Sequence, residues 1–478
     1  MLFFKDFVPI SPFFVAKWMK YPYTILPKTE NWRILSTKLN IVSKKAVKLA
    51  KTTCAAMLKT RGMMMDKLKE LAVNGGTPVA TGLPPRGHLG KEEKAAVDAL
   101  FDEMIATGNA PTYHGKQEES FCKEFAAFMG GGYADGVNSG TTSVFVALRA
   151  LDLPPFSEVL FGCITDNGGV MPIVMNNCIP IPVDTIPGSF NIGPEQIEAR
   201  ITERTSAIVV AHIMGEPADM PAILKVAEKY HLPVIEDCAQ SHAAKINGQN
   251  VGTFGAVGAF SMMSGKHACA GGQGAAVFTK DEKMYWKLRR CADRGKPFGV
   301  QASSSVEVSL NFNMDEIHAA IAREQIKKLP YFAAGRIRVV ERLKSLGLYD
   351  LKCLTFQQTE LKPGFECCYW RLVCQFHADK ATCTKEEYVK ALAAEGLPAF
   401  ADYHAGYPPC HQWYQNRTEL FPWTSPQYKG DRFAVYPCPN AEAALDANFL
   451  LMIQENYSDD DCEKIMRAFK KVDAAYAK

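Results

Sequence analysis

The regular alternation of short apolar runs with helical patterns restricts the fold of this 478-residue chain more than any other feature. From residue 90 onward, most of the runs are continuously apolar, as expected for strands buried on both faces of a sheet. Helical segments separate several of them, and repeated strand–helix–strand order predicts a mainly parallel α/β sheet. The runs span residues 159–161, 179–183, 207–211, 232–235, 256–260 and 275–278.

A long helical pattern at about 314–346 links this region to a second one, and Pro330 lies inside the pattern, where it could break the helix. The second region contains one strand-like segment and two helical segments, at 369–376, 385–395 and 459–476. We therefore expect three parts. These are a leader (1–65), a large domain (66–345) and a smaller α+β domain (346–478).

The leader is strongly basic. Residues 1–65 carry 12 lysines and arginines against only Asp6 and Glu30, whereas the whole chain has a net charge of +3. The remainder is thus slightly acidic and gives no reason to expect a nucleic-acid partner. The apolar stretch 7–16 is too short to span a bilayer, so we expect no membrane insertion. Two interpretations of the leader stay open: organelle targeting or membrane-surface contact, and an inert or misassigned extension.

The 15 cysteines are scattered and contain no C-x-x-C pair, which argues against a zinc knuckle or a thioredoxin-like site. Buried thiols that act as small apolar side chains are typical of a reducing compartment. We expect a cytoplasmic protein without a metal site, while the leader keeps organelle targeting open.

Lys266 and Asp237 form the most informative pair of residues. Lys266 lies in the Gly- and Ser-rich stretch 255–274, and Asp237 follows the apolar run 232–235. A pyridoxal phosphate (PLP) enzyme needs such a pair, because the amine forms a Schiff base with the PLP aldehyde and the carboxylate keeps the pyridine nitrogen protonated. The alternatives are a solvated surface lysine and a helix-capping aspartate.

A candidate phosphate site precedes the helical pattern at 142–151. Ser139-Gly140-Thr141 would place hydroxyls and backbone N–H groups at a helix N-terminus, where an anion binds favourably. Glycine permits a close approach of the backbone to the anion. An ordinary helix cap is the alternative interpretation.

Five ordered blocks resemble the DegT/DnrJ/EryC1/StrS family of sugar aminotransferases, which are fold-type I PLP enzymes. The resemblance covers about residue 70 to the C-terminus, with blocks at 138–148, 212–220, 236–242, 260–274 and 311–321. It implies a mainly parallel seven-stranded sheet with helices on both faces and PLP at its carboxyl edge.

The resemblance also implies roles for individual residues. Lys266 would carry PLP as the internal aldimine and then move protons, while Asp237 would pair with the pyridine nitrogen. Gln240 would donate to the ring hydroxyl oxygen, and His242 would pack or orient its loop. Asn311 would reach the phosphate of a neighbouring subunit, which implies a homodimer; alternatively it only shapes a turn. The phosphate ligands from the chain itself would be Ser139, Gly140, Thr141 and Ser261.

Three positions depart from the family pattern. Gly271-Gly272-Gln273-Gly274 stands where the family has Gly-Glu-Gly-Gly after the lysine and so lacks a carboxylate, Asn313 replaces an arginine, and Asp166 stands where an aromatic ring stacks on PLP. A carboxylate cannot stack as Phe or Trp does. These departures bear on the substrate more than on cofactor binding.

The sequence thus predicts a PLP-dependent aminotransferase that moves an amino group from glutamate or glutamine to a keto-sugar, either nucleotide-linked or a cyclitol. Tyr113, His114 and His212 are candidates for contact with the substrate. The alternatives are a PLP-dependent sugar dehydratase, which in this family has histidine in place of the lysine, and a PLP-binding regulator or scaffold without turnover. The retained Lys266 and Asp237 favour catalysis.

Overall fold

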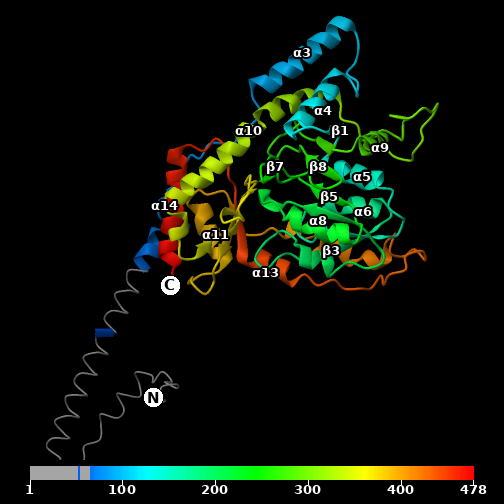
Figure 1. Ribbon diagram of the computed structural model, residues 1–478. Coiled ribbons are helices and arrows are strands. Elements are labelled where there is room, and N and C mark those ends of the chain that lie inside the picture. Colours follow the sequence, from blue (N-terminus) through cyan, green and yellow to red (C-terminus); the bar gives the residue numbers. More distant parts are fainter. Residues whose placement is uncertain (1–51, 54–64) are drawn as a thin grey trace, which may run out of the picture. The chain divides into compact units, whose positions relative to one another are not determined.

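The computed structural model describes residues 52–53 and 65–478 (Figure 1). The chain divides into two compact units, Met1–Asp66 and Lys67–Lys478, and the fold below is that of the second unit. The expectations about the leader concern residues that lie almost entirely outside the described ranges.

A seven-stranded sheet forms the centre of this unit, in the order β1-β9-β8-β5-β4-β2-β3. Four strand pairs are parallel, and β9 alone runs antiparallel to both of its neighbours. The predicted mainly parallel α/β sheet is confirmed. Its strands are β1 (Tyr133–Val137), β2 (Glu158–Gly162), β3 (Ile179–Val183), β4 (Thr205–Ala211), β5 (Val234–Asp237), β8 (Val257–Ser261) and β9 (Ala275–Thr279).

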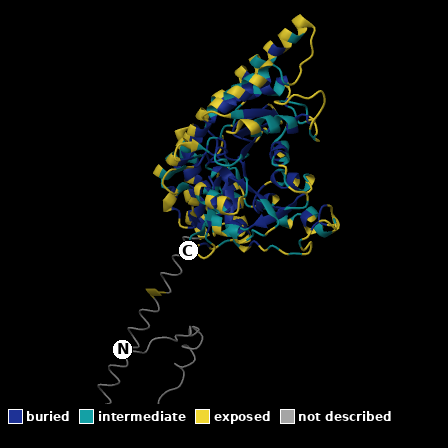
Figure 2. Cartoon of the chain, turned by 45° about the vertical axis from the view of Figure 1, so that its right-hand side comes forward, coloured by how far each residue is buried: buried dark blue, intermediate teal, exposed yellow. Residues whose placement is uncertain are grey.

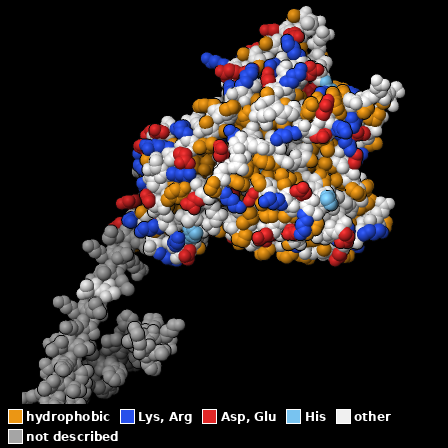
Figure 3. All heavy atoms as spheres, in the orientation of Figure 1, with side chains coloured by type: hydrophobic (Ala, Val, Ile, Leu, Met, Phe, Trp, Pro, Cys, Tyr) orange, Lys and Arg blue, Asp and Glu red, His pale blue; other side chains and the backbone are white. Residues whose placement is uncertain are grey.

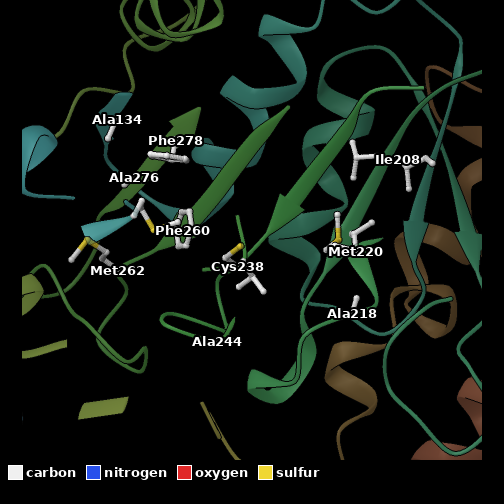
Figure 4. Packing of buried hydrophobic residues seen from close by; sticks show 14 of the residues in the cluster. Ala134, Ile208, Ala218, Met220, Cys238, Ala244, Phe260, Met262, Ala276 and Phe278 are labelled. Carbon is white, nitrogen blue, oxygen red and sulfur yellow. The ribbon is translucent and has the colours of Figure 1, made fainter. Parts of the chain in front are cut away.

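Helices cover both faces of this sheet, which is why its strands are apolar throughout. Along β4, Ala207 and Val209 pack on one face, and Ile208 and Val210 pack on the other. The first face is covered by α5 (Gly140–Ala150), α6 (Met171–Met175) and α9 (Glu282–Ala292). The second is covered by α4 (Lys116–Phe128) and α8 (Met220–Lys229), and Figure 4 shows part of this layer. Buried residues are concentrated in the strands, whereas exposed residues lie on the outer sides of the helices (Figure 2).

A second, antiparallel sheet has the order β10-β12-β14-β13. Its own hydrophobic cluster includes Leu71 and Ala80 from the beginning of the unit. The strands are β10 (Leu354–Thr355), β12 (Leu372–Phe376), β13 (Ala399–Phe400) and β14 (Asn448–Leu451), with α11 (Lys385–Ala394), α13 (Pro439–Ala447) and α14 (Asp459–Tyr476) beside them. A small third sheet contains β6 (Lys245–Ile246), β7 (Gln249–Asn250) and β11 (Phe365–Glu366).

The helix α10 (Glu316–Ser345) continues through Pro330 without a break. Pro330 is exposed, and it supplies no N–H to the carbonyl of Ile326 one turn earlier. The sequence also left β1 unrecognised, because Asp135 and Gly136 interrupt its apolar character.

The remaining helices of the unit include α3 (Lys91–Thr107) and α7 (Pro194–Glu198). Within the described ranges, no helix has the length and apolar character that crossing a bilayer would need. On the face shown in Figure 3, acidic and basic side chains are interspersed among hydrophobic ones.

Candidate active site

The topology of the large sheet gathers the candidate residues at one edge. Because β1, β2, β5 and β8 run in the same direction, the residues that follow them meet at the carboxyl edge, where ligands bind in such sheets. The connection 262–274 between β8 and β9 lies at this edge too and carries Lys266. A cavity of about 210 Å³ opens there, lined by Ser139, Gly140, Thr141, Asp166, Gly168, Gly169, Asp237, Ala239, Ser261, Met263, Lys266 and Gln273.

Lys266 and Asp237 face this cavity as an almost buried pair, with 7% and 8% of their surfaces exposed. Burial lowers the pKa of the Lys266 amine, and the charges of Asp237 and Asp166 offset part of that effect. Burial raises the pKa of Asp237, which the N–H of Ala239 and the charge of Lys266 oppose. The Lys266 Nζ atom lies 4.4 Å from the centre of the Trp370 ring. A lowered amine pKa favours the neutral, nucleophilic form.

The N-terminus of α5 forms the opposite wall. The Ser139 hydroxyl caps this helix by accepting from the Thr142 N–H at 3.3 Å. A Cβ atom at Gly140 would lie 2.5 Å from Cβ of Ser261, so only glycine allows this approach. A Cβ atom at Gly168 would likewise lie 2.7 Å from the Thr141 hydroxyl oxygen. The hydroxyls of Ser139, Thr141 and Ser261 therefore lie close together around the cavity.

Hydrogen bonds to three successive carbonyl oxygens hold the backbone of the Lys266 loop in place. Arg86 donates to the carbonyl oxygens of Lys266 and His267, at 2.6 Å each. The indole N–H of Trp370 donates to the Gly265 carbonyl at 2.9 Å. Arg86 is itself fixed by Glu455 at 2.7 Å, and this carboxylate also accepts from Arg336 at 3.0 Å.

Two of the predicted cofactor ligands do not line the cavity. The Gln240 side chain donates to the Tyr403 hydroxyl at 3.0 Å and accepts from the Met214 N–H at 2.9 Å. Asn311 accepts from the side-chain amide of Asn313 at 2.6 Å. Ser139, Gly140, Thr141, Asp237, Ser261 and Lys266, by contrast, are brought together around one cavity.

His212 does not face a substrate, and that expectation is wrong. Its ring is fully buried, with Nε2 at 3.1 Å from Glu236 and Nδ1 accepting from the Ala218 N–H at 3.0 Å. Both ring nitrogens therefore have partners inside the core, directly after the end of β4. His114 pairs with Glu118 at 2.9 Å, and the Tyr113 hydroxyl accepts from Arg294 at 2.7 Å.

His242 is buried against the aromatic ring of Phe260, as its expected packing role requires. Burial, reinforced by the charge of Lys266, lowers the pKa of His242 to about 3. The imidazole is therefore neutral over the physiological range of pH.

The departures at Asp166 and Gln273 fall on the cavity wall itself. The Asp166 carboxylate accepts from the Gly168 N–H at 2.8 Å and so shapes the turn that follows β2. The neighbouring Asn167 is held by the indole N–H of Trp413 at 2.9 Å. A hydrogen-bonded turn thus occupies the place where the family has a stacking ring.

Sequence reasoning did not find Arg86, Trp370, Arg371 and Tyr403. They come from segments before α3 and around β12 and β13, and no local motif marks them.

The comparisons with known proteins agree with this fold and site. The family model described as the DegT/DnrJ/EryC1/StrS aminotransferase family matches residues 90–470. L-glutamine:2-deoxy-scyllo-inosose aminotransferase from Micromonospora echinospora is 31% identical over 84% of this chain and 97% of that protein. UDP-N-acetyl-3-dehydro-alpha-D-glucosamine 3-aminotransferase from Acidithiobacillus ferrooxidans is 35% identical over 62% of this chain and 76% of that protein.

Solved structures show the same architecture. An aminotransferase from Psychrobacter cryohalolentis superimposes with a TM-score of 0.72 at 25% identity, over 82% of this chain and 99% of that one. The fold and the buried lysine at the sheet edge define an α/β aminotransferase. The chain belongs to the DegT/DnrJ/EryC1/StrS aminotransferase family. Its relatives indicate aminotransferase activity, which the sequence predicted in preference to dehydration or a scaffold role.

Proposed function

We propose that this enzyme holds PLP on Lys266 and transfers an amino group from glutamine or glutamate to a keto-sugar or keto-cyclitol. One observation carries the proposal: Lys266, Asp237 and the N-terminus of α5 line a single cavity. The amine, the carboxylate and the anion-binding end of a helix are the three elements that PLP requires.

The residues present fit the cofactor. The glycine at position 140 lets the N-terminus of α5 lie close to Ser261, so that Ser139, Thr141 and Ser261 line the same cavity. The Asp237 carboxylate reaches the cavity from the end of β5, and Gly169 leaves room in front of it, since a Cβ there would lie 3.0 Å from the Asp237 Oδ2 atom. No carboxylate pairs with the Lys266 amine at salt-bridge distance within the described part of the chain.

PLP, when bound, supplies an electron-accepting ring and an aldehyde that reacts with amines. Lys266 would hold that aldehyde through Nζ and, when free, could carry a proton to and from the reacting carbon. Asp237 would hold a proton on the pyridine nitrogen, and its burial would keep water from competing for that proton. Ser139, Thr141 and Ser261 would hold the phosphate. Gln240 donates to the Tyr403 hydroxyl and so fixes its position.

The amino donor and acceptor follow from the relatives. The Micromonospora relative is named for L-glutamine and an inosose, and the Acidithiobacillus relative for a nucleotide-linked keto-sugar. Both acceptors are cyclic polyols that carry one ketone. We infer an acceptor of this chemical class and glutamine or glutamate as donor.

The expected homodimer is part of the proposal. Asn311 lies outside the cavity of its own chain, so a role at the phosphate requires a second subunit. The preceding segment exposes Val306, Val308 and Leu310, by 45%, 81% and 63%. These apolar side chains support a subunit contact at this segment.

Two further expectations remain proposals. The separate hydrophobic clusters of the two sheets support a large and a small domain linked by α10. All cysteines of the described residues are free thiols, which supports a reducing, cytoplasmic location.

The test uses the purified protein with added PLP. Borohydride reduction fixes any lysine-bound cofactor, and peptide mass spectrometry locates it. We expect the adduct on Lys266 in the wild type and in Lys245→Ala, a lysine outside the cavity, and no adduct in Lys266→Ala. In a separate sample that has not been reduced, glutamine or glutamate should convert the cofactor to its amine form, and a keto-sugar or keto-cyclitol acceptor should reverse this change. An adduct elsewhere, or no adduct, would refute the cofactor assignment.

A further inference from the structure

Arg371 is a cation without a matching anion beside the active site. It immediately precedes β12, and its guanidinium lies 4.8 Å from the centre of the Trp370 ring and 5.5 Å from that of Phe400. Within residues 65–478, no carboxylate lies at salt-bridge distance from it. Burial lowers the pKa of Arg371, and Tyr403 is the only group that acts in the opposite direction. A partly buried charge without a partner is costly unless a ligand completes the site.

The position of this guanidinium relates it to the catalytic amine. Lys266 Nζ lies 4.4 Å from the centre of the same Trp370 ring against which Arg371 packs. The indole is fixed, because its N–H donates to the Gly265 carbonyl. Both cations, the Lys266 amine and the Arg371 guanidinium, thus pack against one fixed ring. A ligand that reaches Lys266 can therefore present an anionic group to Arg371.

Tyr403 supplies a second donor at the same place. Its hydroxyl oxygen accepts from Gln240 at 3.0 Å, so its own proton is available to another acceptor. Burial raises the pKa of Tyr403 to about 12, which keeps that proton in place, and the charge of Arg371 acts on the same hydroxyl. A guanidinium and a phenolic O–H that act on one another suit a carboxylate, which can accept from both.

We propose that Arg371, together with Tyr403, binds the α-carboxylate of the amino donor. The proposal rests on the proposed function and extends it to the donor subsite. An α-amino acid carries its carboxylate on the carbon that bears the amino group, so the carboxylate lies close to the point where the amine meets Lys266. The diphosphate of a nucleotide-linked acceptor is separated from its reacting ketone by several ring bonds. A single unmatched guanidinium also fits one carboxylate charge better than a diphosphate.

The experiment measures the donor half-reaction of the PLP-loaded enzyme by its visible absorption, with glutamine and with glutamine α-amide, which lacks the carboxylate charge. We expect Arg371→Gln to raise the glutamine concentration for half-maximal conversion by about 10- to 100-fold, the value of a hydrogen bond to a charged group. Arg371→Lys should show a smaller increase, because lysine keeps the charge but not the fork geometry. Tyr403→Phe should show a smaller increase too.

The α-amide separates ligand binding from a structural effect. Wild type should require at least about 10-fold more α-amide than glutamine, and Arg371→Gln should lose this preference. Arg432→Gln is the matched control, because Arg432 also stacks on a ring, that of Phe433 at 4.7 Å, but is exposed, whereas Arg371 shares the Trp370 ring with Lys266. It should behave as wild type.

Three results would overturn the inference. Arg371→Gln could match Arg432→Gln with glutamine, or it could raise the requirement for glutamine and its α-amide equally. It could also weaken only the return reaction with a keto-sugar, which would assign the guanidinium to the acceptor. A wild type that converts with neither glutamine nor glutamate would instead refute the proposed function, and the donor subsite with it.

Discussion

Replacing Arg86 by methionine tests how the backbone of the lysine loop is held. The Arg86 side chain is 13% exposed and donates to Glu455, to the Lys266 carbonyl and to the His267 carbonyl. Methionine keeps much of the side-chain volume but removes all three hydrogen bonds. Breaking a buried ion pair costs about 3–5 kcal/mol when the remaining charge is left alone. Because Glu455 keeps its bond to Arg336, we expect the lower end, about 3 kcal/mol.

Urea unfolding of the variant and the wild type measures this loss. Arg338→Met is the control, since Arg338 also donates to a backbone carbonyl of Glu455 but is 47% exposed, and it should lose about 0–1 kcal/mol. The position of the lysine has its own readout, the fraction of Lys266 trapped by borohydride at limiting PLP, which should fall in Arg86→Met alone. A loss below about 1 kcal/mol, or unchanged trapping, would refute the assignment of Arg86 as a positioning residue.

Three more predictions address single residues of the site. Because burial depresses the pKa of His242 to about 3, the unfolded chain binds a proton between about pH 6.5 and pH 3 that the folded chain does not, and stability falls as the pH decreases. His242→Asn should therefore lose about 2 kcal/mol less between pH 7 and pH 5 than wild type, measured by urea unfolding, and equal losses would contradict this. Gly140→Ala should cost about 1–3 kcal/mol and weaken PLP binding, measured by absorption titration, because its Cβ would collide with Ser261, whereas Gly272→Ala meets no atom within 4 Å and should bind PLP normally. Asp237→Asn should slow the donor half-reaction on the order of 100-fold in stopped-flow absorption, because an amide does not hold the ring proton, and an unchanged rate would exclude that role.

Most of the fold follows from local patterns of the sequence. The continuous apolar runs of β2, β3 and β4 are visible without tertiary information, because both of their faces are buried. The strand β1 is not visible in this way. Its Asp135 is buried beside Arg289, 3.5 Å away, and that pairing joins residues 154 positions apart. A buried charge pair of this kind looks like a solvent-exposed segment in the sequence.

The residues of the site also differ in whether the local sequence indicates them. Lys266, Asp237 and Ser139 can be singled out from the sequence, because Asp237 ends an apolar run, Ser139 precedes a helical pattern and Lys266 lies in a Gly- and Ser-rich loop. Arg86 and Glu455 are 369 residues apart, and neither has a local context that indicates the other. The amide of Gln240 bonds Tyr403 and Met214. Tyr403 lies outside every sequence block, so this contact could not be predicted from the sequence.

The loop that carries Lys266 must meet two opposing requirements. In the proposed reaction its amine moves between the cofactor aldehyde and a free state, whereas the carbon that receives the proton stays in place. The structure separates the two requirements between backbone and side chain. The carbonyls of residues 265–267 are fixed by Trp370 and Arg86, while Nζ lies over the face of an indole ring and forms no salt bridge within the described part of the chain. Because the hydrogen bonds hold the backbone, the proposed movement of the side chain would not require the loop to open.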